Sequence, residues 1–340
     1  MRADHLKAGD DEHARFERPK RRTRPRTKDR PNYDDAAIAR VITIDRGRYH
    51  LLFTADEGER VVTAMKSRPL GRKGVVVGDE VRVVGDISGK PDTLARIVEV
   101  RERRTVLRRT ADDDDPIERI IVANAEQLVV VAALADPPPR PRLIDRCLVA
   151  AFDAGMEPVV CLTKADLAEP TEMLALLEPL DVRVVVVQQD GNLDAVRDVL
   201  RNRMSVLVGH SGVGKSTLVN ALVPDADRTT SHVNAITGRG RHTSTSAIVL
   251  ELPFGGLIVD TPGIRSFGLA HIDVDRILLA FPDLNDVTAD CSRGCTHASG
   301  EPECALDDAS ADGRIQPARV ESFRRLLASK DHNKDHADDR

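Results

Sequence analysis

The sequence predicts a multidomain α/β protein: a small β-barrel, then a parallel sheet with helices on both faces, then a cysteine-rich segment with a helix. The chain has 340 residues, which is enough for two or three modules with separate cores. Five short alternating segments come first, at residues 38–44, 49–53, 60–64, 80–84 and 94–100. After residue 116, apolar strands alternate with amphipathic helices, which is the pattern of a helix-covered parallel sheet.

Residues 1–35 form a basic arm that lacks apolar periodicity, and we expect it to be disordered. Between Arg15 and Arg30 the chain has nine Lys or Arg residues against Glu17 and Asp29, a local charge of +7. Basic segments of this kind bind polyanions such as RNA. The alternative is a solvated tail that only aids solubility.

Residues 36–110 are predicted to form the barrel, because Gly, Asp and Pro clusters separate five short strands. The five-stranded OB-fold is the RNA-binding barrel that this pattern favours. Only Tyr49 and Phe53 are available to stack on bases, so RNA binding would rest mainly on charge and backbone contacts. A barrel that serves only as a spacer or docking module is the alternative.

Residues 111–285 are predicted to form the helix-covered sheet, and the acidic run 111–115 marks the connection to it. Strands are expected at 127–134, 158–162, 182–187 and 205–208, and helices at 142–154, 172–178 and 193–203. A cysteine-rich segment at 286–328 follows, with a last helix near 317–328. Residues 329–340 are expected to be disordered.

The sequence indicates neither secretion nor membrane insertion. Hydrophobic residues make up 41% and charged residues 31%, the net charge is -5, and no apolar run approaches the roughly 18 residues that span a bilayer. The N-terminus lacks the apolar stretch of a signal peptide. We therefore expect a cytoplasmic protein without a membrane partner, and we expect a monomer.

A phosphate-binding loop gives the strongest functional signal. The pattern G-x-x-x-x-G-K-S lies between an expected strand at 205–208 and an expected helix at 217–222, which is the context that it requires. Lys215 would neutralise the β- and γ-phosphates, and the Ser216 hydroxyl would bind magnesium. The residues expected to hold the phosphates are Gly209, His210, Ser211, Gly212, Val213, Gly214, Lys215, Ser216 and Thr217.

A second motif favours guanine over adenine. Thr163, Lys164 and Asp166 follow the expected strand 158–162 and resemble the N-K-x-D guanine motif, with threonine in place of asparagine. The Asp166 carboxylate can accept hydrogen bonds from guanine N1–H and the 2-amino group together, which adenine does not offer. The stem of Lys164 can lie over the base.

A third motif lies after the expected strand 257–259. Asp260 and Gly263 match D-x-x-G, so Asp260 would hold magnesium and the Gly263 amide would sense the γ-phosphate. Ile264 stands where Ras-like enzymes have the glutamine that orients water, which predicts slow intrinsic hydrolysis or another catalytic group.

That group is expected in the Gly/Arg/Thr-rich segment 238–245. Thr243 is the favoured magnesium ligand, with Thr245 as the alternative, and His242 is the candidate that orients the attacking water. A solvated loop histidine is the alternative for His242. Together with Lys215, His242 and Thr243 are the predicted catalytic residues.

The order of these motifs is unusual. The guanine motif precedes the phosphate loop by more than forty residues, whereas it follows that loop in ordinary GTPases. We therefore predict a circularly permuted GTPase domain, with its switch and magnesium motifs next to the cysteine-rich segment.

That segment predicts a structural zinc site, because three cysteines and a histidine form a Cys₃His set that leaves no open coordination position. Cys147 and Cys161 each lie in an apolar segment and are expected to be core residues. The predicted zinc ligands are Cys291, Cys295, His297 and Cys304.

Together these features resemble the ribosome small subunit-dependent GTPase A family, also called RsgA or YjeQ. The resemblance covers residues 36–327, and it includes Ala123-Asn124 before the first sheet strand, the permuted motifs, GRGRHTST at 238–245 and Glu301-Pro-Glu-Cys-Ala. It implies a GTP hydrolase that acts late in small-subunit assembly. The implied partners are GTP, GDP, and the small ribosomal subunit with its rRNA, which stimulates hydrolysis; the implied cofactors are one zinc, and magnesium with GTP.

Two departures from the family carry expectations of their own. The usual spacing C-x4-C-x-H-x5-C is C-x3-C-x-H-x6-C here, so a different loop geometry is expected. Gln188-Gln189 replace a serine-alanine motif that supports guanine, which predicts weaker guanine binding or selectivity. The alternative functions are a P-loop ATP-dependent enzyme, which leaves Asp166 without a role, and a nucleotide-regulated RNA-binding protein without subunit-stimulated hydrolysis.

Overall fold

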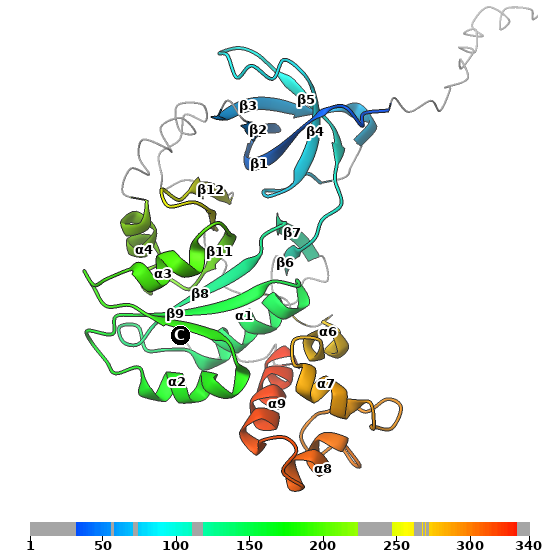
Figure 1. The fold of residues 1–340 in the computed structure, drawn as a ribbon, viewed down its shortest axis with the longest axis vertical. Helices are drawn as coiled ribbons and strands as arrows, with labels where there is room; N and C mark the ends of the chain where they lie inside the picture. The colour runs from blue at the N-terminus through cyan, green and yellow to red at the C-terminus, as the bar shows by residue number, and fades with distance from the viewer. Residues whose placement is uncertain are drawn as a thin grey trace, which may run out of the picture. The chain divides into compact units, whose positions relative to one another are not determined.

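The N-terminal strands close into a five-stranded barrel (Figure 1). The computed structural model describes residues 32–55, 58–70, 74–110, 118–223, 247–261, 267, 269 and 272–331. The barrel strands are β1 (Ala37–Asp45), β2 (Arg48–Ala55), β3 (Gly58–Lys66), β4 (Glu80–Gly85) and β5 (Ala95–Val100). Their order is β1-β2-β3-β5-β4, with β3 and β5 parallel, so the predicted OB-type barrel is confirmed.

Alternation along each strand fills the inside of the barrel. In β3, Val62 and Ala64 are completely buried, whereas the exposed fraction of Met65 is 47%. Because successive side chains of a strand point to opposite faces, one face of β3 packs inward and the other meets solvent. A short 3-10 helix, η1 (Arg68–Leu70), follows β3.

A two-stranded sheet follows the barrel, and the sequence prediction missed it. It pairs β6 (Val106–Thr110) with β7 (Glu118–Ala123) in antiparallel register. The β-branched residues at 120–122 were the available signal. Two β7 residues also reach the segment before β4: Val122 bridges to Val77, and the Ala123 N–H donates to the Val77 carbonyl at 2.9 Å.

The central sheet has six strands in the order β10-β9-β8-β11-β13-β12. They are β8 (Gln127–Ala133), β9 (Glu157–Thr163), β10 (Arg183–Val186), β11 (Met204–Val208), β12 (Ile248–Glu251) and β13 (Leu257–Asp260). Five strands are parallel as predicted, but β12 is antiparallel to β13. The prediction of a wholly parallel sheet is corrected at this edge, because the five residues 252–256 between the two strands allow only a hairpin.

Helices cover both faces of this sheet, as predicted. Leu128 and Val130 of β8 face a core that also contains side chains of α1 (Pro141–Asp153) and α2 (Thr171–Leu177). Val129 and Val131 face a second core, with side chains of α3 (Asp194–Leu200) and α4 (Lys215–Leu222). A second 3-10 helix, η2 (Glu178–Leu180), extends α2.

Helix α3 ends three residues before its predicted end at 203. Asn202 adopts a positive φ of 57°, and its N–H donates to the Gly255 carbonyl at 3.0 Å instead of continuing the helix. The turn between β12 and β13 therefore determines where the chain leaves α3 and enters β11.

The C-terminal part contains four helices in the described residues, of which only the last was predicted. They are α6 (Val274–Leu278), α7 (Pro282–Thr288), α8 (Ala305–Ala311) and α9 (Pro317–Asp331), which runs three residues past the predicted end at 328. The Phe281 ring lies edge-on between Phe152 of α1 and Phe323 of α9, at centroid distances of 5.3 and 5.6 Å. Among the described helices, none combines the length and apolar character of a membrane span.

Candidate nucleotide and metal sites

The phosphate loop joins β11 to α4 and depends on its glycines. Gly212 and Gly214 have positive φ angles of 85° and 86°, where side-chain-bearing residues are strained. A Cβ at Gly209 would lie 2.5 Å from the Val131 carbonyl oxygen, so only glycine allows this close approach. The loop ends at the positive end of α4, where N–H groups without helical partners can bind an anion.

Lys215 and Asp260 meet at the carboxyl edge of the sheet. Lys215 begins α4 directly after the loop, and Asp260 ends β13, the strand adjacent to β11. The Lys215 ammonium donates to Asp260 Oδ1 and lies 3.4 Å from the Thr261 carbonyl oxygen. The predicted phosphate-binding cation and the predicted magnesium residue therefore belong to one site.

The guanine motif reaches the same edge from β9. Thr163 ends β9 and is buried, with an exposed fraction of 6%. Its hydroxyl donates to the Val213 carbonyl inside the phosphate loop at 2.7 Å. A β-hydroxyl at this position thus ties the guanine motif to the phosphate loop.

The two other residues of the guanine motif contact neighbouring loops. Lys164 has a positive φ of 60°, and its ammonium donates to the Asp136 carbonyl. The Asp166 Oδ1 accepts a hydrogen bond from the Gln189 N–H at 2.8 Å. The loop that contains Gln188-Gln189 therefore lies beside Asp166, and its backbone N–H holds the Asp166 carboxylate.

Of the nine residues expected to hold the phosphates, Val213 is buried and the others are exposed or half-buried. The ring of His210 bonds to the Ser211 carbonyl through Nδ1 at 2.9 Å. The predicted switch residues His242 and Thr243, and also Gly263, lie outside the described residues.

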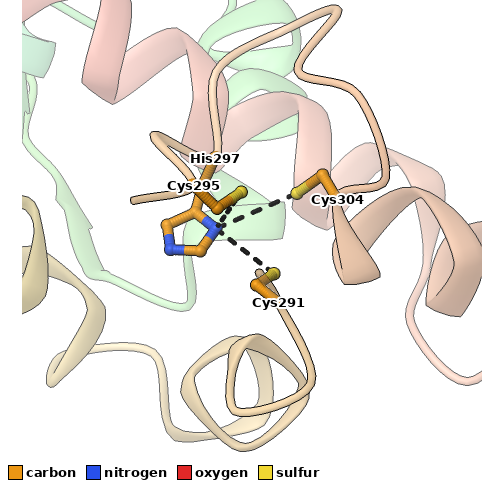
Figure 2. A group of neighbouring side chains, drawn as sticks. All are labelled: Cys291, Cys295, His297 and Cys304. Carbon is orange, nitrogen blue, oxygen red and sulfur yellow. Dashed lines mark hydrogen bonds between the residues drawn. The ribbon is translucent and has the colours of Figure 1, made fainter. Parts of the chain in front are cut away.

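The four predicted zinc ligands converge in the C-terminal part (Figure 2). One ligand atom from each of Cys291, Cys295, His297 and Cys304 lies within 4.8 Å of the others. Left-handed backbone at Gly294, His297 and Glu303 turns the chain tightly between the ligands. The altered spacing therefore still brings all four residues together.

The distances in this cluster suit a tetrahedral ion. The Nδ1 atom of His297 lies 3.6, 3.4 and 3.9 Å from the sulfurs of Cys291, Cys295 and Cys304, respectively (Figure 2). Zinc bonds of about 2.3 Å to sulfur and about 2.0 Å to nitrogen would separate the two ligand atoms by roughly 3.5 Å. Burial lowers the pKa of His297, which favours the neutral imidazole that binds metals.

Groups around the cluster hold its ligands in place. The Ala305 N–H, at the start of α8, donates to the Cys291 sulfur at 3.3 Å. Arg324 of α9 donates from Nε to the His297 carbonyl at 3.1 Å and makes a two-pronged ion pair with Asp307 at 2.6 and 2.8 Å. Hydrogen bonds of this kind orient metal ligands.

The two remaining cysteines behave as the sequence predicted. Cys147 in α1 and Cys161 in β9 are buried among apolar side chains. Burial raises the pKa of each thiol to about 12. Neither thiol is therefore ionised at neutral pH.

Sequence reasoning missed two contacts around the predicted nucleotide site. The segment 136–137 lies over the phosphate loop, since a Cβ at Gly212 would be 3.4 Å from Pro137. Arg146 of α1 donates to the Phe267 carbonyl at 2.7 Å, just beyond the magnesium motif. The proline run at 137–139 marked the first contact as a loop, but no sequence pattern indicated the second.

The comparison with known proteins identifies the family. A family model named RsgA GTPase matches residues 100–270. The small ribosomal subunit biogenesis GTPase RsgA of Chlorobaculum parvum is 36% identical over 307 residues, which cover 86% of this chain and 98% of the relative. The chain belongs to the RsgA GTPase family. The predicted family and its GTPase class are therefore confirmed.

Solved structures agree on the fold of this RsgA-family chain. The crystal structure of YjeQ from Thermotoga maritima has a TM-score of 0.65 at 23% identity, and the match covers 88% of this chain and 99% of that one. YloQ, described as a circularly permuted GTPase, has a TM-score of 0.64 at 23% identity, covering 90% and 98%. The predicted permuted fold is thus confirmed.

Proposed function

We propose that this chain hydrolyses GTP to GDP and phosphate during a late step in the assembly of the small ribosomal subunit. The observation that carries the proposal is the contact between Lys215 and Asp260, which unites the phosphate loop and the magnesium motif although 45 positions separate them. Relatives such as the one from Chlorobaculum parvum are named small ribosomal subunit biogenesis GTPases, which supports the biological setting.

Guanine recognition is proposed to rest on Asp166. Its Oδ1 already accepts the Gln189 N–H, so the second carboxylate oxygen and the remaining lone pairs stay available for guanine N1–H and the 2-amino group. Thr163 keeps the guanine motif and the phosphate loop in register by bonding to Val213. The stem of Lys164 is proposed to cover the base.

Phosphate binding is proposed to use the loop from Gly209 to Thr217. Its backbone N–H groups and the positive end of α4 would hold the phosphates, and Lys215 would exchange part of its contact with Asp260 for the β- and γ-phosphate oxygens. The hydroxyl of Ser216 and the carboxylate of Asp260 are the hard oxygen donors that Mg²⁺ prefers, and Lys215 places them in one site. Bound magnesium would neutralise charge on the phosphates.

The groups that orient the attacking water and close over the γ-phosphate are proposed to come from segments outside the described residues. In this scheme His242 orients a water molecule toward the γ-phosphorus, Thr243 closes over the γ-phosphate as a magnesium ligand, and the Gly263 amide senses that phosphate. The water oxygen forms the new bond to phosphorus as the bond to the bridging oxygen of GDP breaks.

The cysteine and histidine cluster is proposed to hold one zinc ion with a structural role. Three thiolates and one imidazole fill a tetrahedral shell, which leaves no position for substrate. The ion would stabilise the turns between α7 and α8, where regular hydrogen-bonded structure is sparse.

The remaining proposals concern organisation and partners. We propose a basic arm at 1–35, a barrel at 36–110, a GTPase domain at 111–285, a zinc-binding domain at 286–328 and a tail at 329–340. Residue 285 lies within α7, and α7 packs against α8, so the whole of α7 would belong with the zinc-binding domain. We propose that the chain acts as a cytoplasmic monomer, contacts rRNA through the barrel, and hydrolyses GTP faster on the small subunit.

The test is phosphate release from GTP and from ATP, with and without purified small ribosomal subunits. We expect slow release from GTP alone, a sharp rise with subunits, and loss of both in Lys215→Ala. Arg201→Ala is the matched control, because that side chain contacts Asp198 and Phe254 instead. Equal use of ATP would favour an ATP-dependent enzyme, and an unchanged rate with subunits would favour a nucleotide-regulated RNA-binding protein.

A further inference from the structure

Two adjacent arginines of α9 connect the metal cluster to α1. Arg324 donates to the His297 carbonyl at 3.1 Å, inside the cluster. Arg325 donates to both carboxylate oxygens of Asp145 in α1, at 3.0 and 3.3 Å, and to the Leu176 carbonyl at 3.3 Å. Because successive residues of a helix point about 100° apart, one turn of α9 contacts both partners at once.

The next residue of α1 continues this connection to the nucleotide site. Arg146 donates to the Phe267 carbonyl at 2.7 Å, and the Phe267 side chain is buried with an exposed fraction of 2%. Phe267 lies seven positions after Asp260 in the sequence, so Arg146 holds a residue that follows the magnesium motif closely. Hydrogen bonds thus lead from the cluster through α9 and α1 to Phe267.

The buried position of Asp145 makes α1 sensitive to the position of α9. The Asp145 side chain is 2% exposed, and Arg325 supplies the cation beside it. A buried carboxylate that loses its partner is strongly destabilised, so α1 cannot keep its packing unchanged when α9 shifts. Loss of the ion would release the turn at His297, and the resulting shift of Arg324 and Arg325 in α9 would weaken the contact of Arg325 with Asp145.

We propose that metal binding at the cysteine and histidine cluster and nucleotide binding at the phosphate loop are thermodynamically coupled through Arg324, Arg325, Asp145 and Arg146. The proposal rests on the nucleotide and metal sites proposed above. These four side chains touch neither nucleotide nor metal, so they act as positioning residues. Coupling of this kind is reciprocal: the factor by which metal strengthens nucleotide binding equals the factor by which nucleotide strengthens metal binding.

The experiment measures two coupling factors on the full chain: the effect of Zn²⁺ on nucleotide affinity and the effect of nucleotide on Zn²⁺ affinity. The affinity for a fluorescent GTP analogue is compared between protein loaded with Zn²⁺ and protein stripped by a chelator. The affinity for Zn²⁺ is measured by competition with a coloured chelator, with and without saturating GTP. We expect each ligand to strengthen binding of the other by about threefold or more. If the stripped chain does not remain folded, the Zn²⁺ affinities measured with and without GTP decide the result.

Variants distinguish this route from general stabilisation. Asp145→Asn removes the charge that holds Arg325, and Arg146→Gln removes the donor to Phe267, so each should reduce both factors toward one while Zn²⁺ affinity without GTP stays the same. Asp283→Asn is the matched control, since it weakens a third two-pronged pair of α9, between Asp283 and Arg319, without touching α1. It should keep the wild-type factors.

Two results would overturn the proposal: wild-type factors of one, or wild-type factors that persist in both Asp145→Asn and Arg146→Gln. The assay is repeated with an ATP analogue. A protein that binds both nucleotides equally would contradict the GTPase proposal, yet its coupling factors would still be measured, so the two failures are distinguishable.

Discussion

The Thr163 hydroxyl donates to the Val213 carbonyl at 2.7 Å and so joins the guanine motif to the phosphate loop across 50 positions of sequence. Thr163 is buried at the end of β9, and Val213 is completely buried within the loop. A family motif that usually begins with asparagine is served here by a shorter side chain, because the hydroxyl already lies within reach of the loop. The threonine hydroxyl therefore connects this motif directly to the phosphate loop.

This contact predicts that Thr163→Val weakens GTP binding. Valine has the same shape but no donor, so the Val213 carbonyl is left buried without this partner, at a cost of about 1–3 kcal/mol. We expect GTP affinity to fall by roughly fivefold or more in equilibrium titrations. Thr163→Ser, which keeps the hydroxyl, should bind like the wild type. Unchanged affinity in Thr163→Val would show that the bond does not support the nucleotide site.

Local patterns predicted the barrel, most of the central sheet and both sites, because each has a short-range signature. Alternation identified the barrel strands, and the run from Gly209 to Ser216 specified a strand, loop and helix by itself. The four residues of the cysteine and histidine cluster were likewise identified by their chemistry and their proximity in sequence. Such features need few long-range contacts to be recognised.

The features that sequence could not supply depend on distant partners. Gln189 supports Asp166 through its backbone N–H, which no side-chain motif reports. Arg146 and Arg325 are ordinary helix residues until Phe267 and Asp145 are placed beside them. The antiparallel direction of β12 likewise follows from its hairpin with β13 and not from its apolar pattern.

Two carboxyl groups on different parts of the fold predict a pH dependence of stability. Glu251 of β12 is hydrogen-bonded to Glu59 of β3, and burial followed by this neighbour raises the pKa of Glu251 from 4.5 to about 7. As pH rises from about 4.5 to about 7, the unfolded chain releases this proton while the folded chain keeps it. The contribution of this group to the free energy of unfolding is therefore fully present at acidic pH, and it is lost as the pH rises through about 7.

Glu251→Gln should remove this loss, because an amide does not ionise. Urea unfolding at pH 5, 6, 7 and 8 would compare its slope with that of the wild type, and we expect the variant to gain relative stability as pH rises. Glu321→Gln, on an exposed position of α9, is the control and should follow the wild type. Parallel curves for Glu251→Gln and wild type would contradict the shared proton.

The close contact between Gly78, before β4, and Ala123, at the end of β7, predicts an unusually costly glycine substitution. Gly78 has a positive φ of 87°, and a Cβ there would lie 2.0 Å from the Ala123 carbonyl oxygen. Gly78→Ala should therefore add a backbone clash, about 1–3 kcal/mol, to about 1–2 kcal/mol of left-handed strain. Gly47→Ala, with a φ of 80° but open space, should show the strain alone. Equal losses of unfolding free energy, measured in denaturant, in Gly78→Ala and Gly47→Ala would show that the chain around Gly78 and Ala123 moves apart without cost.

The five cysteines predict two classes of thiol. Those of Cys291, Cys295 and Cys304 belong to the cysteine and histidine cluster, whereas burial raises the pKa of Cys147 and Cys161 to about 12 and so leaves these two thiols protonated and unreactive. A colorimetric thiol reagent at pH 8 should react slowly with zinc-loaded protein and quickly with three thiols after chelation. The other two should react only in denaturant. Cys304→Ser should reduce the fast class to two thiols, and a fast class of five after chelation would mean that the cluster metal holds the entire fold together.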